Sequence, residues 1–178
     1  KTADTAWTAL RKIELHRNDV RIGMVERDVT LKFRRPSSED VTQAKAFLAV
    51  KAKDAIDQLP RLAQNYAHST LRAAERSEES IDVKLQAIRI GDTAICGIPF
   101  EAFVEMGLDL KKRSPFPHTL VVGLANGRHG YLPTFDQHQL GGYETWLGTN
   151  HVQEDASTIL TTQLLEMLKQ LSADRSQP

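Results

Sequence analysis

The chain has 178 residues, of which 40% are hydrophobic and 26% are charged, a length and composition that predict one globular domain with a buried core. Lys plus Arg and Asp plus Glu both number 23, and this zero net charge argues against nucleic acid or an anionic membrane surface as a partner, because both favour a basic excess. No apolar run reaches the ~20 residues of a membrane span.

The first part of the chain opens on Lys1, with neither a methionine nor a secretory signal. We therefore expect a processed form or a fragment, in which residues 1–178 make a single domain or a half-domain. Apolar residues at helical spacing predict a helix over 1–14. Alternating apolar residues predict one strand over 20–33, or two strands joined by a bulge or turn near Glu26, where the alternation changes phase.

Two helices are predicted next. Ser37 or Ser38 can cap the first, whose apolar residues recur at helical spacing over 41–60. The second covers 62–74 and is moderately amphipathic. The polar stretch ERSEES that follows predicts a solvated link to the second half of the chain.

The second half begins with a predicted β-hairpin of strands 83–91 and 93–98, joined at a Gly-Asp turn. The second of these strands is a continuous apolar run, so Cys96 within it is expected to be a buried, inert thiol. Pro99 is expected to open a helix whose last turn is basic and whose apolar face is formed by Phe100, Phe103, Val104, Leu108 and Leu110.

A buried strand over 118–126 and a helix over 155–171 complete the pattern, and the tail at 172–178 is expected to fray. We find no internal repeat. Helices that alternate with strands predict an α/β or α+β layered fold, in which helices cover one mixed β-sheet.

Two side chains follow buried strands and are candidates for chemistry. Glu101 is predicted in the first turn of a helix, at the carboxyl edge of the sheet where sites of layered folds gather, although acids favour first turns for the helix dipole alone. Tyr131 follows the next strand in GLANGRHGYLPT, either as a reactive phenol or as a ring that caps the core. His129 beside it could bind a metal or face solvent.

The segment QLGGYETWLGTN is a third candidate region. It predicts either a loop shaped over a pocket or an aromatic lid built on Tyr143 and Trp146. A triad of Ser114, His118 and Asp136 can be written down, but no G-x-S-x-G elbow positions the serine. The C-x-x-C, H-E-x-x-H and P-loop motifs are also missing from the sequence.

Taken together, AIRIGDTAICGIPFEAFVEMG, SPFPHTLVVGLANGRHGYLPT and GGYETWLG resemble the later part of the catalytic domain of the neutral/alkaline, non-lysosomal ceramidase family, and in particular its bacterial ceramidase-like members. The match is good over the second half of the chain and loose over the first. Members of that family are zinc amidases that cleave the N-acyl bond of ceramide. The resemblance implies that this chain is the C-terminal portion of a larger zinc amidase domain.

The resemblance also implies roles for three residues. Glu101 stands at the zinc-binding glutamate of a G-x-P-x-E pattern, and Tyr131 at the zinc-binding tyrosine of an N-x-x-x-x-Y-[LV]-x-T pattern. Tyr143 corresponds to a tyrosine that assists catalysis near the metal. A dication favours the phenolate form of such a tyrosine and acidifies a bound water, while a neighbouring phenol can donate to the oxyanion.

The family's zinc also takes two histidines from an earlier part of the domain. His16 and His68 precede Glu101 but lie in segments that do not match the histidine motifs. Because a catalytic zinc needs about three protein ligands, we expect a missing N-terminal portion to supply the histidines and expect this chain alone to be inactive.

Several alternatives stay open at this stage. The implied substrate is a hydrophobic N-acyl, ceramide-like amide, any membrane contact would come through that substrate, and the family suggests a secreted or periplasmic protein. Six apolar side chains could line a groove for the substrate or pack in the core: Phe100, Phe103, Phe116, Phe135, Leu140 and Trp146. A metal-free structural or interaction module that kept the fold, or a different hydrolase on the same metal frame, would show the same pattern.

Overall fold

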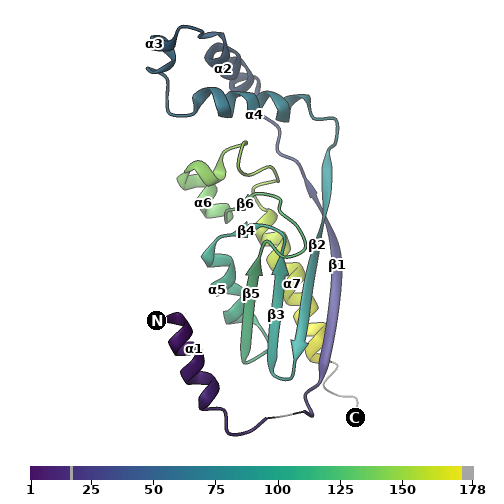
Figure 1. Cartoon of the computed structure of the whole chain (residues 1–178). Helices are drawn as coiled ribbons and strands as arrows, with labels where there is room; N and C mark the ends of the chain where they lie inside the picture. Colours follow the sequence, from purple (N-terminus) through teal and green to yellow (C-terminus); the bar gives the residue numbers. More distant parts are fainter. Residues whose placement is uncertain (17, 174–178) are drawn as a thin grey trace.

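A four-stranded mixed sheet forms the centre of the computed structural model, which describes residues 1–16 and 18–173 (Figure 1). The strand order is β1-β2-β3-β5, with antiparallel pairing between β1 and β2 and between β2 and β3, and parallel pairing between β3 and β5. The strands are β1 (Ile22–Lys32), β2 (Ser80–Ile90), β3 (Thr93–Ile98) and β5 (His118–Gly123). The predicted layered fold with a mixed sheet and helices is therefore confirmed.

Two helices cover one face of this sheet. Helix α7 (Ala156–Ala173) packs on β1 and β2, and α5 (Val104–Arg113) packs on β5 and α7. The predicted apolar stripe of α7 is buried, and it meets the inward-facing side chains of β2 and β3 in the core. Cys96 is fully buried there, and burial raises the pKa of its thiol to about 12, as expected of an inert cysteine.

The opposite face of the sheet is uncovered and carries exposed apolar side chains beside a charged group of Glu26, Asp28 and Lys84. We call it the open face and define it by five side chains that are 44–73% exposed: Ile22, Met24, Ile90, Leu120 and Val122. The pairing places them on one surface, because Ile22 lies opposite Ile90. Strand β5 is thus an edge strand that buries only Thr119, which corrects the prediction of a buried strand over 118–126.

The open face also explains the change of phase near Glu26, where the structure has one strand, the first of the two predicted alternatives, and no bulge. Strand β1 pairs with β2 without interruption from Ile22 to Lys32. Val29 and Leu31 face the core, whereas Ile22 and Met24 lie on the open face. Apolar residues therefore occupy both faces of one continuous strand, and the sequence shows this as a change of phase.

Three helices form a separate group beyond the far ends of β1 and β2 (Figure 1). They are α2 (Ser38–Ala49), α3 (Lys53–Ile56) and α4 (Ala63–Glu75). Ser37 caps α2 in a capping box with Asp40, as one of the two predicted caps. The single helix predicted over 41–60 is wrong, because the chain becomes extended at Val50; the side-chain amide of Gln64 donates to the carbonyls of Phe47 and Val50 at 3.0 and 2.9 Å, at the end of α2.

The helix predicted from Pro99 begins instead at Val104. Glu101 and Ala102 form a two-residue strand, β4 (Glu101–Ala102), because the Glu101 and Phe103 amides donate to carbonyls of the segment around β6 (Tyr131–Leu132). The predicted apolar face is correct in part: Leu110 is buried as predicted, whereas Val104 and Leu108 are exposed and Met106 is buried in their place.

The ends of the chain differ from the core. Helix α1 (Thr2–Arg11) is shorter than the predicted 1–14 and buries none of its residues. Helix α7 continues to Ala173, and the remainder of the predicted frayed tail, 174–178, lies outside the described residues. Within the described ranges, no helix combines the length and apolar character needed to cross a membrane.

Candidate functional site

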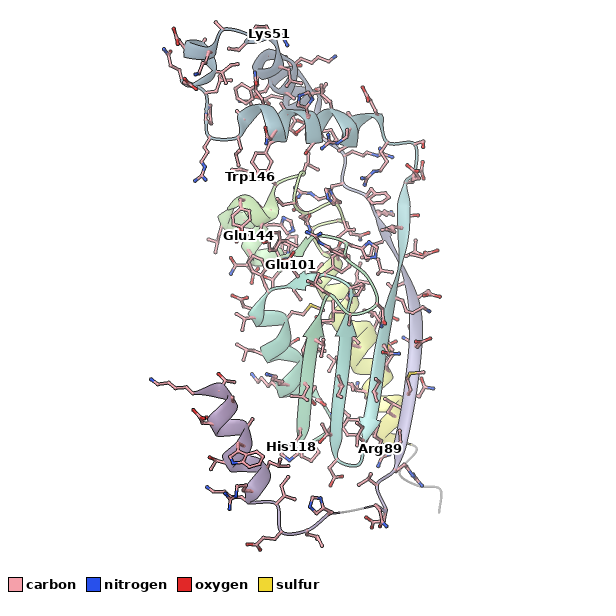
Figure 2. All side chains as sticks on the ribbon, in the orientation of Figure 1. Lys51, Arg89, Glu101, His118, Glu144 and Trp146 are labelled. Atoms are coloured by element: carbon pink, nitrogen blue, oxygen red, sulfur yellow. The ribbon has the colours of Figure 1, made fainter. Side chains whose placement is uncertain are left out.

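Glu101 and Tyr131 lie side by side at the carboxyl ends of the two parallel strands. Strands β3 and β5 end together at the pair Ile98–Gly123, and the chain enters β4 and β6 beyond them. In this second, two-stranded sheet Glu101 is the parallel partner of Tyr131, and the Glu101 amide donates to the Gly130 carbonyl at 3.0 Å. Figure 2 shows Glu101 just beyond the ends of the strands, where layered α/β folds place their sites.

The Tyr131 phenol contacts both other candidates. Its hydroxyl lies 3.2 Å from the hydroxyl of Tyr143, which belongs to a short 3-10 helix, η1 (Tyr143–Thr145), and the two rings meet edge to face. The hydrogen bond with Tyr143 raises the pKa of Tyr131 to about 12, helped by burial and by the negative charge of Glu101. Glu101, Tyr131 and Tyr143 therefore form one cluster of oxygens, with the Tyr131 phenol protonated.

A buried asparagine that the sequence patterns did not indicate supports this cluster through the backbone of Tyr131. Asn150 is fully buried, and its side-chain amide donates to the Tyr131 carbonyl at 3.0 Å. Arg34 donates to the Asn150 side-chain oxygen at 3.1 Å and to the Thr145 carbonyl at 2.6 Å. Neither residue carried a sequence signal, because a single polar residue in a loop or after a strand has no periodicity.

Gly130 and Thr149 complete the support. Gly130 has a φ of +84°, and a β-carbon at this position would collide with the Thr149 carbonyl oxygen. That same carbonyl accepts a hydrogen bond from the Tyr131 amide at 3.0 Å, and the Thr149 hydroxyl donates to the carbonyls of Tyr143 and Trp146. Thr149 thus ties the two tyrosines of the cluster to one loop.

A cavity of about 510 Å³ opens beside the cluster. Its wall includes Glu101 and Tyr131, together with His129 and His151. Burial lowers the pKa of His151, and the nearby positive charges of Arg76, Arg34 and Arg72 lower it further, against a hydrogen bond with the Leu147 backbone that raises it. The volume is within the range of small-molecule sites.

The other sequence candidates lie elsewhere. His16 and His68 are exposed and do not line the cavity, whereas His129 lines it, half-buried, with its ring 5.5 Å from that of Phe100. Ser114, His118 and Asp136 do not form a catalytic triad. Figure 2 places His118 at the opposite end of the sheet from Glu101, and the Ser114 hydroxyl accepts a hydrogen bond from the Thr119 hydroxyl.

The aromatic side chains named for a groove divide into two groups. Phe100 and Phe116 are buried in the core, whereas Phe135 and Leu140 of α6 (Phe135–Leu140) are exposed. Trp146 packs edge to face on Tyr66 of α4, with ring centroids 4.5 Å apart, and so joins the loop above the site to the helical group (Figure 2).

The cluster contains two side chains of the kind that can bind a metal ion. Glu101 and Tyr131 present two oxygen donors side by side, and each carries or can acquire a negative charge that a cation would balance. In the part of the chain that the structure describes, no three His, Cys, Asp or Glu side chains are grouped closely enough to hold a metal ion. A complete catalytic zinc site needs about three protein ligands, so further ligands are required.

These observations define a layered α/β domain whose candidate site follows two parallel strands. No protein-family model matches the chain, and neither does any curated protein. Among solved structures, it is similar to the neutral ceramidase from Pseudomonas aeruginosa, with 16% sequence identity and a TM-score of 0.56 over 85% of this chain and 28% of that one. It is also similar to a ceramidase complexed with C2, with 20% identity and a TM-score of 0.48 over 52% of this chain and 15% of that one.

The chain therefore has a ceramidase-like fold, and it spans less than a third of the ceramidase chains to which it is similar. The resemblance that the motifs implied is confirmed at the level of the fold.

Proposed function

We propose that this chain carries one part of a zinc-dependent amidase site, in which Glu101 and Tyr131 are zinc ligands and Tyr143 acts on the substrate. The observation that carries the proposal is the convergence of these three side chains. The register of β4 and β6 sets Glu101 beside Tyr131, and the Tyr143 hydroxyl lies 3.2 Å from the Tyr131 hydroxyl. Three groups that the family resemblance names independently thus share one small volume.

Each of the three residues has a separate chemical task. When bound, zinc supplies a Lewis acid and a water of lowered pKa for attack on an amide carbonyl. Glu101 binds as a carboxylate. Tyr131 binds as a phenolate, after it loses the proton that Tyr143 and Glu101 otherwise keep on its hydroxyl by raising its pKa. The Tyr143 hydroxyl donates a hydrogen bond to the carbonyl oxygen as negative charge develops on it.

The remaining zinc ligands come, in this proposal, from the rest of a longer enzyme. Two ligands bind zinc weakly, and two histidines from a preceding portion would complete the set. The aligned Pseudomonas ceramidase is long enough to hold such a portion, because this chain spans only 28% of it. Without that portion we expect the chain to hydrolyse nothing.

The open face is the surface to which we assign that missing portion. Its five side chains (Ile22, Met24, Ile90, Leu120 and Val122) leave apolar surface in water, at a cost of about 25 cal/mol per Å² relative to burial. An apolar layer from the same polypeptide would bury it. Ile22 and Ile90 lie at the end of the sheet away from Glu101, whereas Val122 adjoins the end of β5 that leads into the site, so a portion docked along the whole face would extend toward Glu101 at Val122.

The proposed substrate is a hydrophobic N-acyl amide of the ceramide type. A similar solved structure is named as a ceramidase, and the exposed side chains of Phe135, Leu140 and Trp146 offer apolar contacts near the site. Contact with a membrane surface would arise through such a substrate and needs no basic patch, in keeping with the zero net charge.

Metal analysis of the full-length protein tests the proposal. We expect about one zinc per molecule, less than about one tenth of that occupancy in Tyr131→Phe and Glu101→Gln, and a normal content in Tyr143→Phe. Hydrolysis of a fluorescent N-acyl sphingosine should be lost in the first two variants and should fall about 10²- to 10³-fold in kcat in Tyr143→Phe.

The matched control is Tyr66→Phe, which removes a phenol hydroxyl from α4, outside the cluster, and should change neither zinc content nor activity. A metal-free interaction module is the second candidate, favoured by the incomplete ligand group in the described part of the chain. Equal zinc content in Tyr131→Phe and Tyr66→Phe, with no hydrolysis by the wild type, would establish that second candidate and remove the first.

A further inference from the structure

Arg76 presents an unpaired guanidinium to the cavity beside the candidate site. It follows the last residue of α4, lines the cavity with Glu101 and Tyr131, and stacks over the ring of Phe33 at 3.8 Å. Within the described ranges, 1–16 and 18–173, this guanidinium has no hydrogen bond and no ion pair. Stacking fixes the plane of the guanidinium and leaves its N–H edge free to bind.

The backbone beneath Arg76 is held rigidly. The Arg35 guanidinium donates to the carbonyls of Ala73, Arg76 and Glu78 at 3.1, 2.5 and 2.6 Å, and so clasps the segment that leaves α4. Arg76 is half-buried as a result. A guanidinium that is both stacked and mounted on a fixed backbone loses little entropy when it binds a ligand.

The charge around Arg76 is mainly positive. Arg128 lines the same cavity, and the Arg76 charge contributes to the lowered pKa of His151, whose largest cause is burial. Two acids oppose this. Glu101 lies on the wall that carries the candidate ligands, and Glu78 is exposed. The pKa of Glu78 is lowered mainly by hydrogen bonds with its own backbone and with Ser77, and in smaller part by the charge of Arg76. A positive wall therefore adjoins the proposed zinc ligands.

We propose that Arg76 binds the carboxylate of a ligand in this cavity, which is either an acidic N-acyl amide such as an N-acyl amino acid, accepted beside neutral ceramide-type amides, or the fatty acid that amide hydrolysis releases. Arginine pairs with a carboxylate through two parallel hydrogen bonds, a geometry that a neutral amide or alcohol cannot reproduce. The identity of the ligand as substrate or product rests on the proposed amidase function, whereas carboxylate binding itself does not.

The rest of the cavity suits such a ligand. Phe33, Ile81 and Val152 form apolar parts of the wall between the charged groups, and the volume of about 510 Å³ accommodates a short acyl chain. Two molecules could supply the carboxylate, a free fatty acid released by amide hydrolysis or the amino-acid half of an N-acyl amino acid.

Calorimetric titration of the full-length protein separates these sources. Decanoate, N-decanoylglycine and the neutral N-decanoylethanolamine are titrated into the wild type, Arg76→Gln and Arg72→Gln. We expect Arg76→Gln to weaken binding of the carboxylates about 10- to 100-fold and to leave the neutral amide unchanged. Tighter binding of N-decanoylglycine than of decanoate identifies the substrate as the source, and the reverse order identifies the product.

Arg72→Gln is the matched control, because it removes the same charge from an exposed position on α4 that does not line the cavity. An equal loss in both variants would reduce the effect to general electrostatics and overturn the proposal, as would carboxylate binding that Arg76→Gln leaves intact. Thermal denaturation confirms that the variants are folded. Carboxylate binding that depends on Arg76, in a protein without zinc or hydrolysis, would support this inference while refuting the amidase function.

Discussion

The position of the Tyr131 phenol depends on residues that have no chemical role of their own. Gly130 lets the chain turn sharply before Tyr131, and Asn150 holds the Tyr131 carbonyl from the opposite side. Arg34 fixes Asn150 in turn. The proposed role of Tyr131 as a zinc ligand requires its hydroxyl to be held within about half an ångström, so these supporting residues should matter as much as the cluster itself.

Gly130→Ala should destabilise the protein and displace Tyr131. The positive φ alone costs a residue with a β-carbon about 1–2 kcal/mol, and the collision with the Thr149 carbonyl adds to this. Gly107→Ala is the matched control, since nothing lies within 4 Å of the new β-carbon on α5, and it should stabilise by about 0.5–1 kcal/mol. Urea denaturation measures both; stabilisation by both changes would contradict the strained turn.

Asn150→Ala should lower the free energy of unfolding by about 1–3 kcal/mol, because the Tyr131 carbonyl and an Arg34 N–H would both be left unpaired in the interior. Asn150→Asp keeps the acceptor for Arg34 but removes the donor to Tyr131, so it should lose zinc affinity with less loss of stability. Asn65→Ala, on the exposed surface of α4, should stay within about 0.5 kcal/mol. Equal unfolding midpoints in Asn150→Ala, Asn150→Asp and Asn65→Ala would show that the hydrogen bonds of Asn150 do not stabilise the fold.

At the scale of elements, long periodic segments could be predicted and short ones could not. Helix α7 and the hairpin of β2 and β3 carry sustained apolar patterns, so their type and position followed from the sequence. The two-residue strands β4 and β6 have no pattern to detect, because their pairing is set by the tertiary fold. For that reason Pro99 was interpreted as the start of a helix that begins five residues later, at Val104.

The candidate site divides in the same way. Its chemistry was inferred from motifs around Glu101, Tyr131 and Tyr143, and their meeting place from the rule that sites follow the carboxyl ends of parallel strands. Arg76 and Asn150 could not be inferred, because α4 and the loop after Trp146 approach β4 and β6 only in three dimensions.

For the whole molecule, the unequal covering of the two sheet faces is the feature that most needs a partner. Helices α5 and α7 bury one face, while the open face, with Met24, Leu120 and Val122 among its side chains, meets solvent. An apolar sheet face of this kind promotes aggregation when it is left bare. The open face also explains the change of phase in the apolar pattern of β1, since this strand carries apolar residues on both of its faces.

Val122→Glu in the full-length protein should separate a covered open face from a bare one. If the remaining portion of the enzyme packs there, a carboxylate at this position is buried without a partner and should cost about 3–5 kcal/mol of stability together with bound zinc. Val104→Glu is the matched control: it introduces the same charge at a 69% exposed position at the start of α5, away from the open face, where an acid suits the helix dipole. Unfolding midpoints and zinc content that are unaffected in both variants would mean that the open face faces water in the intact protein, and the missing zinc ligands would then have to reach Glu101 and Tyr131 from another side.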